Sequence, residues 1–176
     1  ETSGYSHLYR CDLSENKDGK NTTTQLTHGN YEIHEAYLSK DKTHFFISAN
    51  KNHPGNREFY SLNIETKVLI PLLTSDGNHE VSVSPDEKWL AVRYSTKNNP
   101  WELYLSPLKE NTALTQITHS TTTAFNAYAW RAPEVIPFKA TDGTTVYARV
   151  YRPKAEVSNK AGVLFVHGAG YLQNAH

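Results

Sequence analysis

Leu38-Ser39-Lys40-Asp41, followed by Thr43-His44-Phe45-Phe46-Ile47-Ser48, decides the fold of this 176-residue chain, because the same pattern occurs twice. It recurs 45 residues later as Val83-Ser84-Pro85-Asp86, followed by Lys88-Trp89-Leu90-Ala91-Val92-Arg93. Ser and Asp side chains accept backbone N–H bonds in tight turns, and Pro fixes φ. Each copy is therefore predicted to form two short strands joined by the same turn.

A second pair of similar segments follows these two copies. Arg57-Glu58-Phe59-Tyr60-Ser61-Leu62 recurs 44 residues later as Trp101-Glu102-Leu103-Tyr104-Leu105-Ser106, and a third, partial copy is His7-Leu8-Tyr9-Arg10-Cys11-Asp12-Leu13. Every copy leads to a Leu-Thr or Ile-Thr step, in Gln25-Leu26-Thr27, Leu72-Leu73-Thr74 and Gln116-Ile117-Thr118. The alternation of side chains in these segments is typical of strands.

A repeat near 45 residues with about four strands per unit is typical of a β-propeller blade. A helix-containing solenoid is the structural alternative, but the segments lack a helical period. We therefore expect residues 1–130 to be the C-terminal blades of a β-propeller, about two to three in number. Such an open arc of blades exposes sheet edges, so we expect it to pack against preceding blades, a second polypeptide or a copy of itself.

The pattern changes from Ala132 onward. Two alternating runs, residues 135–140 and 145–151, flank Thr141-Asp142-Gly143-Thr144, and Asp-Gly between such runs indicates a hairpin. The apolar run Ala161-Gly162-Val163-Leu164-Phe165-Val166 then predicts a buried strand. A hairpin that leads into a buried strand is how α/β-hydrolase sheets begin. The expected fold is therefore mainly β, with a partial propeller followed, over residues 131–176, by the truncated N-terminal strands of an α/β-hydrolase catalytic domain.

The turn after this run carries the candidate catalytic residues. His167, Gly168 and Ala169 form a His-Gly-x-Gly turn with Gly170, and small residues there let backbone N–H groups point at a developing oxyanion. We expect these residues to be part of an oxyanion hole. No serine of the chain lies in a G-x-S-x-G frame, so a Ser/Asp/His triad is not in this chain.

Composition excludes several other classes of function. Lys+Arg and Asp+Glu are both 18, and no basic run stands out, which argues against nucleic-acid binding. Cys11 is alone and is expected to be buried or half-buried. The Asp41 and Asp86 turns lack the further carboxylates of a calcium loop. We expect no cofactor and no metal site, since histidines other than His167 show no ligand spacing and are expected on turns or the surface, namely His7, His28, His34, His44, His53, His79, His119 and His176.

The order of these segments resembles the dipeptidyl-peptidase IV branch of the prolyl oligopeptidase family of serine peptidases. The resemblance extends over essentially the whole chain and rests on Ser3-Gly4-Tyr5-Ser6-His7-Leu8-Tyr9, Leu26-Thr27-His28-Gly29-Asn30-Tyr31-Glu32-Ile33, Ser48-Ala49-Asn50, Pro54-Gly55-Asn56-Arg57-Glu58-Phe59-Tyr60, Val81-Ser82-Val83-Ser84-Pro85-Asp86 and the tail from the Asp-Gly hairpin to Gly170.

The resemblance implies a propeller that caps a hydrolase domain and admits short peptides. The intact protein is then expected to be a serine exopeptidase that cleaves dipeptides from peptide N-termini, with this fragment itself inactive. Its partners are expected to be the peptide substrate, the remaining blades and catalytic domain, and a second copy in a homodimer. An exported protein (periplasmic, secreted or membrane-anchored) is favoured over a cytoplasmic one. The family's paired glutamates should precede Glu1, and Glu32 and Glu35 are expected to be ordinary blade residues.

One position departs from the family pattern. Dipeptidyl-peptidase IV has a tyrosine where this chain has His167, so the oxyanion donor is either the His167 side chain, the backbone around Gly168 and Ala169, or the phenol of Tyr171. Two alternatives to the exopeptidase stay open. One is a propeller scaffold or binding module on a non-catalytic hydrolase-like domain, and the other is an oligopeptidase or acylaminoacyl-peptidase.

Overall fold

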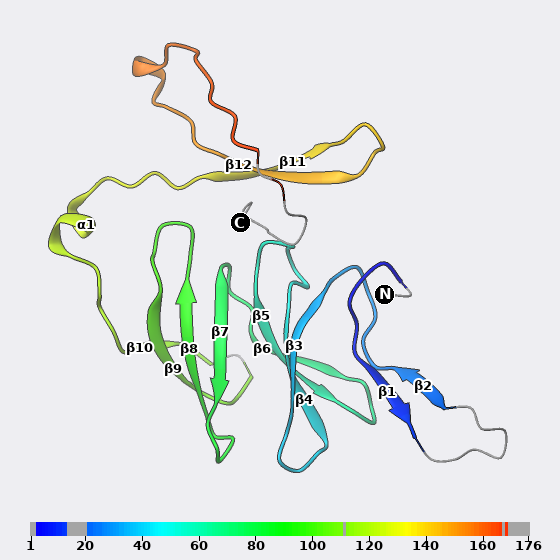
Figure 1. Ribbon diagram of the computed structural model, residues 1–176. Coiled ribbons are helices and arrows are strands. Elements are labelled where there is room, and N and C mark those ends of the chain that lie inside the picture. Colours follow the sequence, from blue (N-terminus) through cyan, green and yellow to red (C-terminus); the bar gives the residue numbers. More distant parts are fainter. Residues whose placement is uncertain (1–2, 14–20, 111, 167, 169–176) are drawn as a thin grey trace.

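The computed structural model describes residues 3–13, 21–110, 112–166 and 168, and within them the chain is mainly β. Two four-stranded antiparallel sheets dominate, with a two-stranded sheet before them and another after them (Figure 1). The first large sheet has the order β3-β4-β5-β6 and the second has the order β10-β9-β8-β7. These two sheets are consistent with two blades of a propeller. No helix in the described part of the chain has the length and apolar character needed to cross a membrane.

The strands of the two large sheets keep the spacing of the sequence repeat. The first sheet consists of β3 (Ile33–Leu38), β4 (His44–Ala49), β5 (Glu58–Asn63) and β6 (Leu69–Leu73). The second consists of β7 (Asn78–Val83), β8 (Trp89–Ser95), β9 (Glu102–Pro107) and β10 (Thr115–Gln116). Each strand pairs with the next one in the chain, so each sheet is a meander. The prediction of two full blades is confirmed at the level of these sheets.

The predicted Ser-x-Asp turn has the same hydrogen bonds in both sheets. Ser39 Oγ donates to Asp41 Oδ1 over 2.6 Å, and the Ser84–Asp86 pair repeats the bond at 2.6 Å. The same serine oxygens accept the backbone N–H of the first residue of β4 and of β8. The bond from Ser39, and then those from Thr43, lower the pKa of Asp41 to about 2. The interpretation of these aspartates as turn residues is therefore confirmed.

The partial copy at the N-terminus forms a two-stranded sheet that is consistent with the outer half of a further blade. β1 (Tyr9–Asp12) pairs with β2 (Thr22–Gln25) as β9 pairs with β10. The Leu-Thr and Ile-Thr steps explain why the two strand pairs are similar. Thr27 Oγ1 accepts the N–H of Leu8 over 3.0 Å, and Thr118 Oγ1 accepts the N–H of Leu103 over 2.8 Å. Cys11, in β1, is exposed, so the expectation of a buried or half-buried thiol was wrong. β1 has one strand neighbour among the described residues, and no layer covers this side chain.

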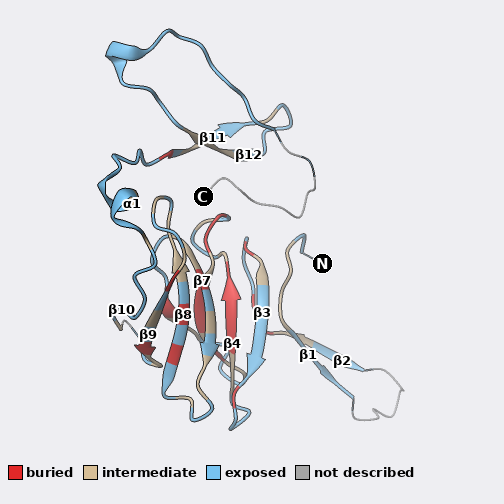
Figure 2. Ribbon diagram, turned by 60° about the vertical axis from the view of Figure 1, so that its left-hand side comes forward, coloured by how far each residue is buried: buried red, intermediate tan, exposed pale blue. Residues whose placement is uncertain are grey.

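Two apolar cores hold the successive layers together. The larger core lies between the two four-stranded sheets and includes Phe46, Phe59, Leu90 and Val92. The other face of β4 contributes Ile47 and Ala49 to a second core, which also contains Tyr31. Figure 2 shows β4 as largely buried and β3 as largely exposed, because β4 is interior to its sheet whereas β3 is an edge strand.

The last described elements form a hairpin beyond the blades. A short helix, α1 (Thr123–Ala127), leads to β11 (Glu134–Lys139) and β12 (Thr145–Val150), and a 3-10 turn, η1 (Ala155–Val157), follows. β11 and β12 pair antiparallel, and Gly143 has a φ of 84° in their connection, where Asp142 accepts the N–H of Thr144. The hairpin predicted from Asp-Gly is confirmed. The helix α1 had not been predicted.

The segment after the hairpin differs from its prediction. Residues 161–166 form no strand, and Val163 is 101% exposed and Phe165 79% exposed. The prediction of a buried strand here was therefore wrong for the described structure. A strand needs a neighbouring strand to receive its backbone hydrogen bonds and a layer to cover its side chains, and the described part of the chain provides neither for this run.

Candidate functional site

One end of the two blades faces the hairpin and gathers polar side chains. The ring of His53, in the β4–β5 connection, contacts the ring of Tyr147 in β12, with the centroids 4.6 Å apart. Figure 1 shows the start of β3, the start of β7 and the β4–β5 connection at this end. We call this surface the upper rim and define it as residues 32–35, 50–57 and 76–79.

Glu32 holds the chain before β1 against the upper rim. Its carboxylate accepts the N–H of Ser6 over 2.5 Å, and its own N–H donates to Asn50 Oδ1 over 2.6 Å. The backbone of Ile33 also donates to the carbonyl of Ser6. These bonds give Glu32 a structural role, and its interpretation as an ordinary blade residue stays a prediction.

Glu35 and His34 lie next to it on the exposed strand β3. Glu35 accepts a hydrogen bond from the Tyr37 hydroxyl over 2.6 Å, so the two side chains share one face of the strand. Desolvation, and then the positive charge of Arg57, lower the pKa of His34. Glu35 is exposed on the upper rim, so its carboxylate is accessible to a positively charged ligand group.

The junction between the two blades forms the second part of the upper rim. The N–H of Arg57 donates to the carbonyl of Gly77, and the carbonyl of Arg57 accepts the N–H of His79. Asn56 accepts the N–H of Gly77 and donates to Asp76, both at 3.3 Å. The guanidinium of Arg57 donates to the carbonyl of Asn56 over 2.8 Å. These bonds fix the start of β7 against the start of β5.

His79 is the buried centre of this junction, with 3% of its surface exposed. Its Nδ1 donates to the carbonyl of Arg57 over 2.7 Å, and its Nε2 accepts from the Ser75 hydroxyl over 3.0 Å. Its ring stacks on Tyr94, with the centroids 4.4 Å apart. The expectation of a turn or surface histidine was wrong here. The signal that could have shown this is the alternation of His79, Val81 and Val83 on one face of the strand.

Burial of His79 predicts a pH-dependent stability. Desolvation lowers the pKa of His79 from its ordinary value of 6.5, so the unfolded chain takes up the proton first as the pH falls. Stability is then fully present above about pH 6.5 and decreases below it. We expect the free energy of unfolding, measured with urea, to fall between pH 7.5 and pH 5.

The variant H79F tests the assignment of this pH dependence. We expect H79F to reduce the slope of stability against pH below pH 6.5, because phenylalanine does not titrate, although it loses the bond to Arg57 at every pH. The exposed His119 supplies the matched control H119Q, which should keep the original slope. An unchanged slope in H79F would show that other groups cause the effect.

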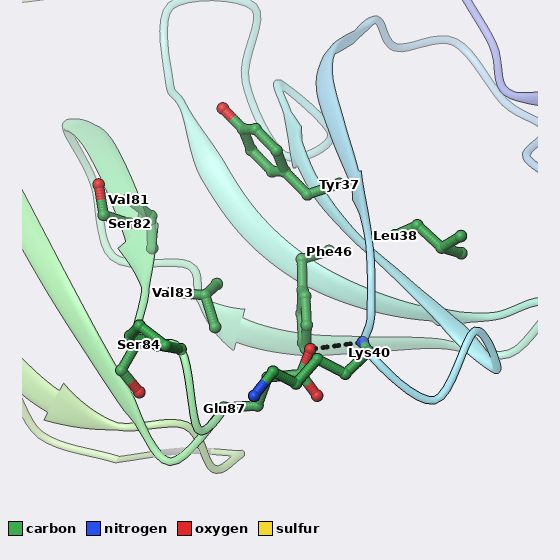
Figure 3. A pocket seen from close by; sticks show the side chains of 10 residues that line it. Tyr37, Leu38, Lys40, Phe46, Val81, Ser82, Val83, Ser84 and Glu87 are labelled. Carbon is green, nitrogen blue, oxygen red and sulfur yellow. Dashed lines mark hydrogen bonds between the residues drawn. The ribbon is translucent and has the colours of Figure 1, made fainter.

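A groove opens between the first strands of the two blades, with a volume of about 350 Å³. Figure 3 shows Tyr37 on the side of β3, Val81 and Val83 on the side of β7 and Phe46 between them, whereas the Leu38 side chain points to the other side of β3. At the end away from the upper rim, Glu87 accepts the N–H of Lys40 over 2.7 Å and joins the two blades. The groove is apolar inside and polar at this end.

Among the residues predicted to form an oxyanion hole, the structure describes Gly168. His167 and Ala169 lie outside the described residues, as does Tyr171. Gly168 is described and exposed, with no atom within 4 Å of the position that a Cβ would take. In the described residues, no group of three or more His, Cys, Asp or Glu side chains could hold a metal ion.

Comparison with known proteins gives one family match. Residues 1–101 match the family model described as "Dipeptidyl peptidase IV (DPP IV) N-terminal region". The matched segment contains β1 to β8 and ends just before β9. The comparison with curated proteins gives no match for this chain. The match therefore includes the upper rim and the groove, and it stops before the hairpin.

Proposed function

Because this chain belongs to the dipeptidyl peptidase IV N-terminal region family, we propose that it forms part of a serine exopeptidase that releases dipeptides from peptide N-termini. In this proposal, residues 1–130 are the C-terminal blades of the propeller that encloses the substrate, and residues 131–176 are the first strands of the α/β-hydrolase catalytic domain. The single observation that carries the proposal is the family match, which relates the chain to dipeptidyl peptidase IV-type peptidases.

The chemistry would require groups that lie elsewhere in the intact polypeptide. A serine, whose proton a histidine accepts, attacks the scissile carbonyl, and the C–N bond breaks as the histidine gives that proton to the leaving amine of the shortened peptide. Water then hydrolyses the acyl-enzyme and releases the dipeptide. The share proposed for this chain is electrostatic: His167, Gly168 and Ala169 would offer N–H groups, or the His167 ring, to the oxyanion. Gly168 supports this role, since a residue without Cβ lets a substrate oxygen approach the backbone.

The proposal predicts that the 176-residue chain alone cleaves no Ala-Pro anilide, because none of its serines lies in a G-x-S-x-G frame. Release of the chromogenic aniline is the measurement. Turnover by the isolated chain that an organophosphate abolishes would contradict the prediction.

The longer polypeptide tests the activity itself. We expect cleavage of Ala-Pro anilide with a free amino terminus and no cleavage of its acetylated form, because an exopeptidase of this type requires the free amine. Preference for the acetylated form would indicate an acylaminoacyl-peptidase instead. In that polypeptide, H167A should lower kcat about 10²-fold or more if the ring donates to the oxyanion, and an unchanged kcat would assign the role to the backbone.

A second candidate is a propeller scaffold or binding module on a non-catalytic domain, and it could use an exposed apolar surface of the second blade. The outer face of the second blade exposes large apolar side chains, namely Trp89, Leu103, Leu105 and Ile117. This face suits a further blade of the same polypeptide or a second copy in a homodimer. We propose an exported location for either form. Absence of cleavage by the longer polypeptide, together with retained binding of a partner, would favour the scaffold.

A further inference from the structure

The groove between the blades is bounded by two strands with free edges. β3 and β7 are each the terminal strand of their sheet, so each has a neighbour on one side only. Both strands start at the upper rim, and both border the groove (Figures 1 and 3). A free strand edge carries backbone donors and acceptors that another extended chain can pair with.

The hydrogen bonds show which backbone groups of β7 face the groove. The N–H of Ser84 donates toward β8, to the carbonyl of Trp89, whereas the N–H of His79 donates away from β8, to Arg57. Since backbone groups alternate in direction along a strand, those of Val81 and Val83 point away from β8. They therefore lie on the free edge.

The same argument applies to β3. The N–H of Ser39 donates toward β4, to the carbonyl of His44, and the N–H of Lys40 points away from β4, to Glu87. The backbone groups of Ala36 and Leu38 consequently face away from β4. In the described residues, no strand pairs with this edge beyond the bond at Lys40.

The side chains between the two edges suit one apolar group. Phe46 forms the base of the groove and is buried, while Tyr37, on the same face, remains 47% exposed. A volume of about 350 Å³ lies at the lower end of the range for ligand pockets. Nothing in the described chain covers these side chains, although burying them would be favourable.

The negative charge of Glu35, at the end of the groove nearest the upper rim, sets a second requirement for a ligand. Glu35 and Tyr37 lie on one face of β3, and Glu35 is one step nearer the upper rim. Glu35 makes no ion pair with a described residue. A basic side chain two residues before an apolar one would therefore meet Glu35 when the apolar side chain lies over Phe46.

We propose that this groove binds an extended peptide segment by pairing with the free edge of β3. The segment runs parallel to β3, with its amino-terminal end toward the upper rim, and carries a basic residue against Glu35 and an apolar residue over Phe46. This inference rests on the proposed function: the groove holds the part of a substrate peptide that follows the released dipeptide. The segment continues toward the hairpin, where the catalytic domain is proposed to begin.

The test uses the 176-residue chain and a labelled peptide, Ala-Pro-Gly-Thr-Lys-Thr-Val-Thr-Gly. Fluorescence anisotropy gives the Kd. We expect Y37K to weaken binding at least 10-fold, because it removes the apolar ring beside Phe46 and places an ammonium group where it pairs with Glu35. The control V68K introduces the same side chain at a position outside the groove that is similarly exposed, at 53%, and should stay within twofold. Equal losses in both variants would overturn the proposal.

Two further measurements keep the test decisive if Y37K does not fold, as judged by circular dichroism. E35Q should weaken binding about fivefold at low salt, while E110Q, at an exposed position, should not. A peptide with Lys and Val exchanged should bind at least fivefold more weakly to the unmodified chain. Equal binding of both peptides would overturn the proposed direction and pairing. Binding requires no catalysis, so a longer polypeptide that binds the peptide but cleaves nothing contradicts only the proposed function.

Discussion

Phe59→Ala is expected to lower the free energy of unfolding by about 3–5 kcal/mol, the range for removing a buried aromatic ring. Phe59 is 1% exposed, stacks near Phe46 with the ring centroids 6.2 Å apart, and lies in the core between the two blades. A domain is usually stable by only about 5–15 kcal/mol, so this one change removes a large fraction of the total. Urea unfolding monitored by circular dichroism measures the loss.

The hairpin offers the matched control for this substitution. Phe138 is 50% exposed in β11, so Phe138→Ala should cost less than about 1 kcal/mol. The contrast tests whether the two sheets pack as one unit. Similar small losses in both variants would show that the core between the blades does not stabilise the chain in solution.

Gly77→Ala is expected to have the second large effect, about 2–5 kcal/mol. Gly77 has a φ of 126°, and an added Cβ would lie 2.3 Å from the carbonyl oxygen of Ser95. The backbone conformation alone costs an L-residue about 1–2 kcal/mol, and the clash with a backbone atom adds about 1–3 kcal/mol. Because Gly77 bonds to Arg57 and Asn56, the change should also loosen the junction between the blades.

Gly143→Ala separates the two causes. Gly143 also has a positive φ, 84°, but no atom lies within 4 Å of its Cβ position. This control should therefore cost only about 1–2 kcal/mol, the conformational part alone. A loss in Gly77→Ala no larger than that in Gly143→Ala would mean that β8 can move away from Gly77 at little cost.

Local patterns of the sequence predicted most of the fold. The 45-residue spacing located both four-stranded sheets, and the Ser-x-Asp turns after β3 and β7 formed as expected. Asp142-Gly143 correctly indicated the hairpin. These predictions succeeded because side-chain alternation and turn hydrogen bonds involve residues that are close in the chain.

The candidate site could be predicted only in part. The groove between β3 and β7 and the burial of His79 both require that the two blades pack face to face, and no short pattern states which sheet lies against which. Residues 163–166 show that an apolar pattern by itself does not predict burial either. Their apolar side chains resemble those of a buried strand, yet they are exposed, since burial requires a neighbour as well as a suitable sequence.

The repeat of Leu38-Ser39-Lys40-Asp41 by itself determined that this protein is built from meandering β-sheets and where each begins. Turn hydrogen bonds and the alternation of side chains depend on residues that are close in the chain, so the sequence alone predicts them. Only the tertiary structure decided that His79 is enclosed at a junction, that Cys11 is exposed and that two free strand edges border one groove. Burial and free edges depend on which elements pack together, and that is a property of the assembled layers.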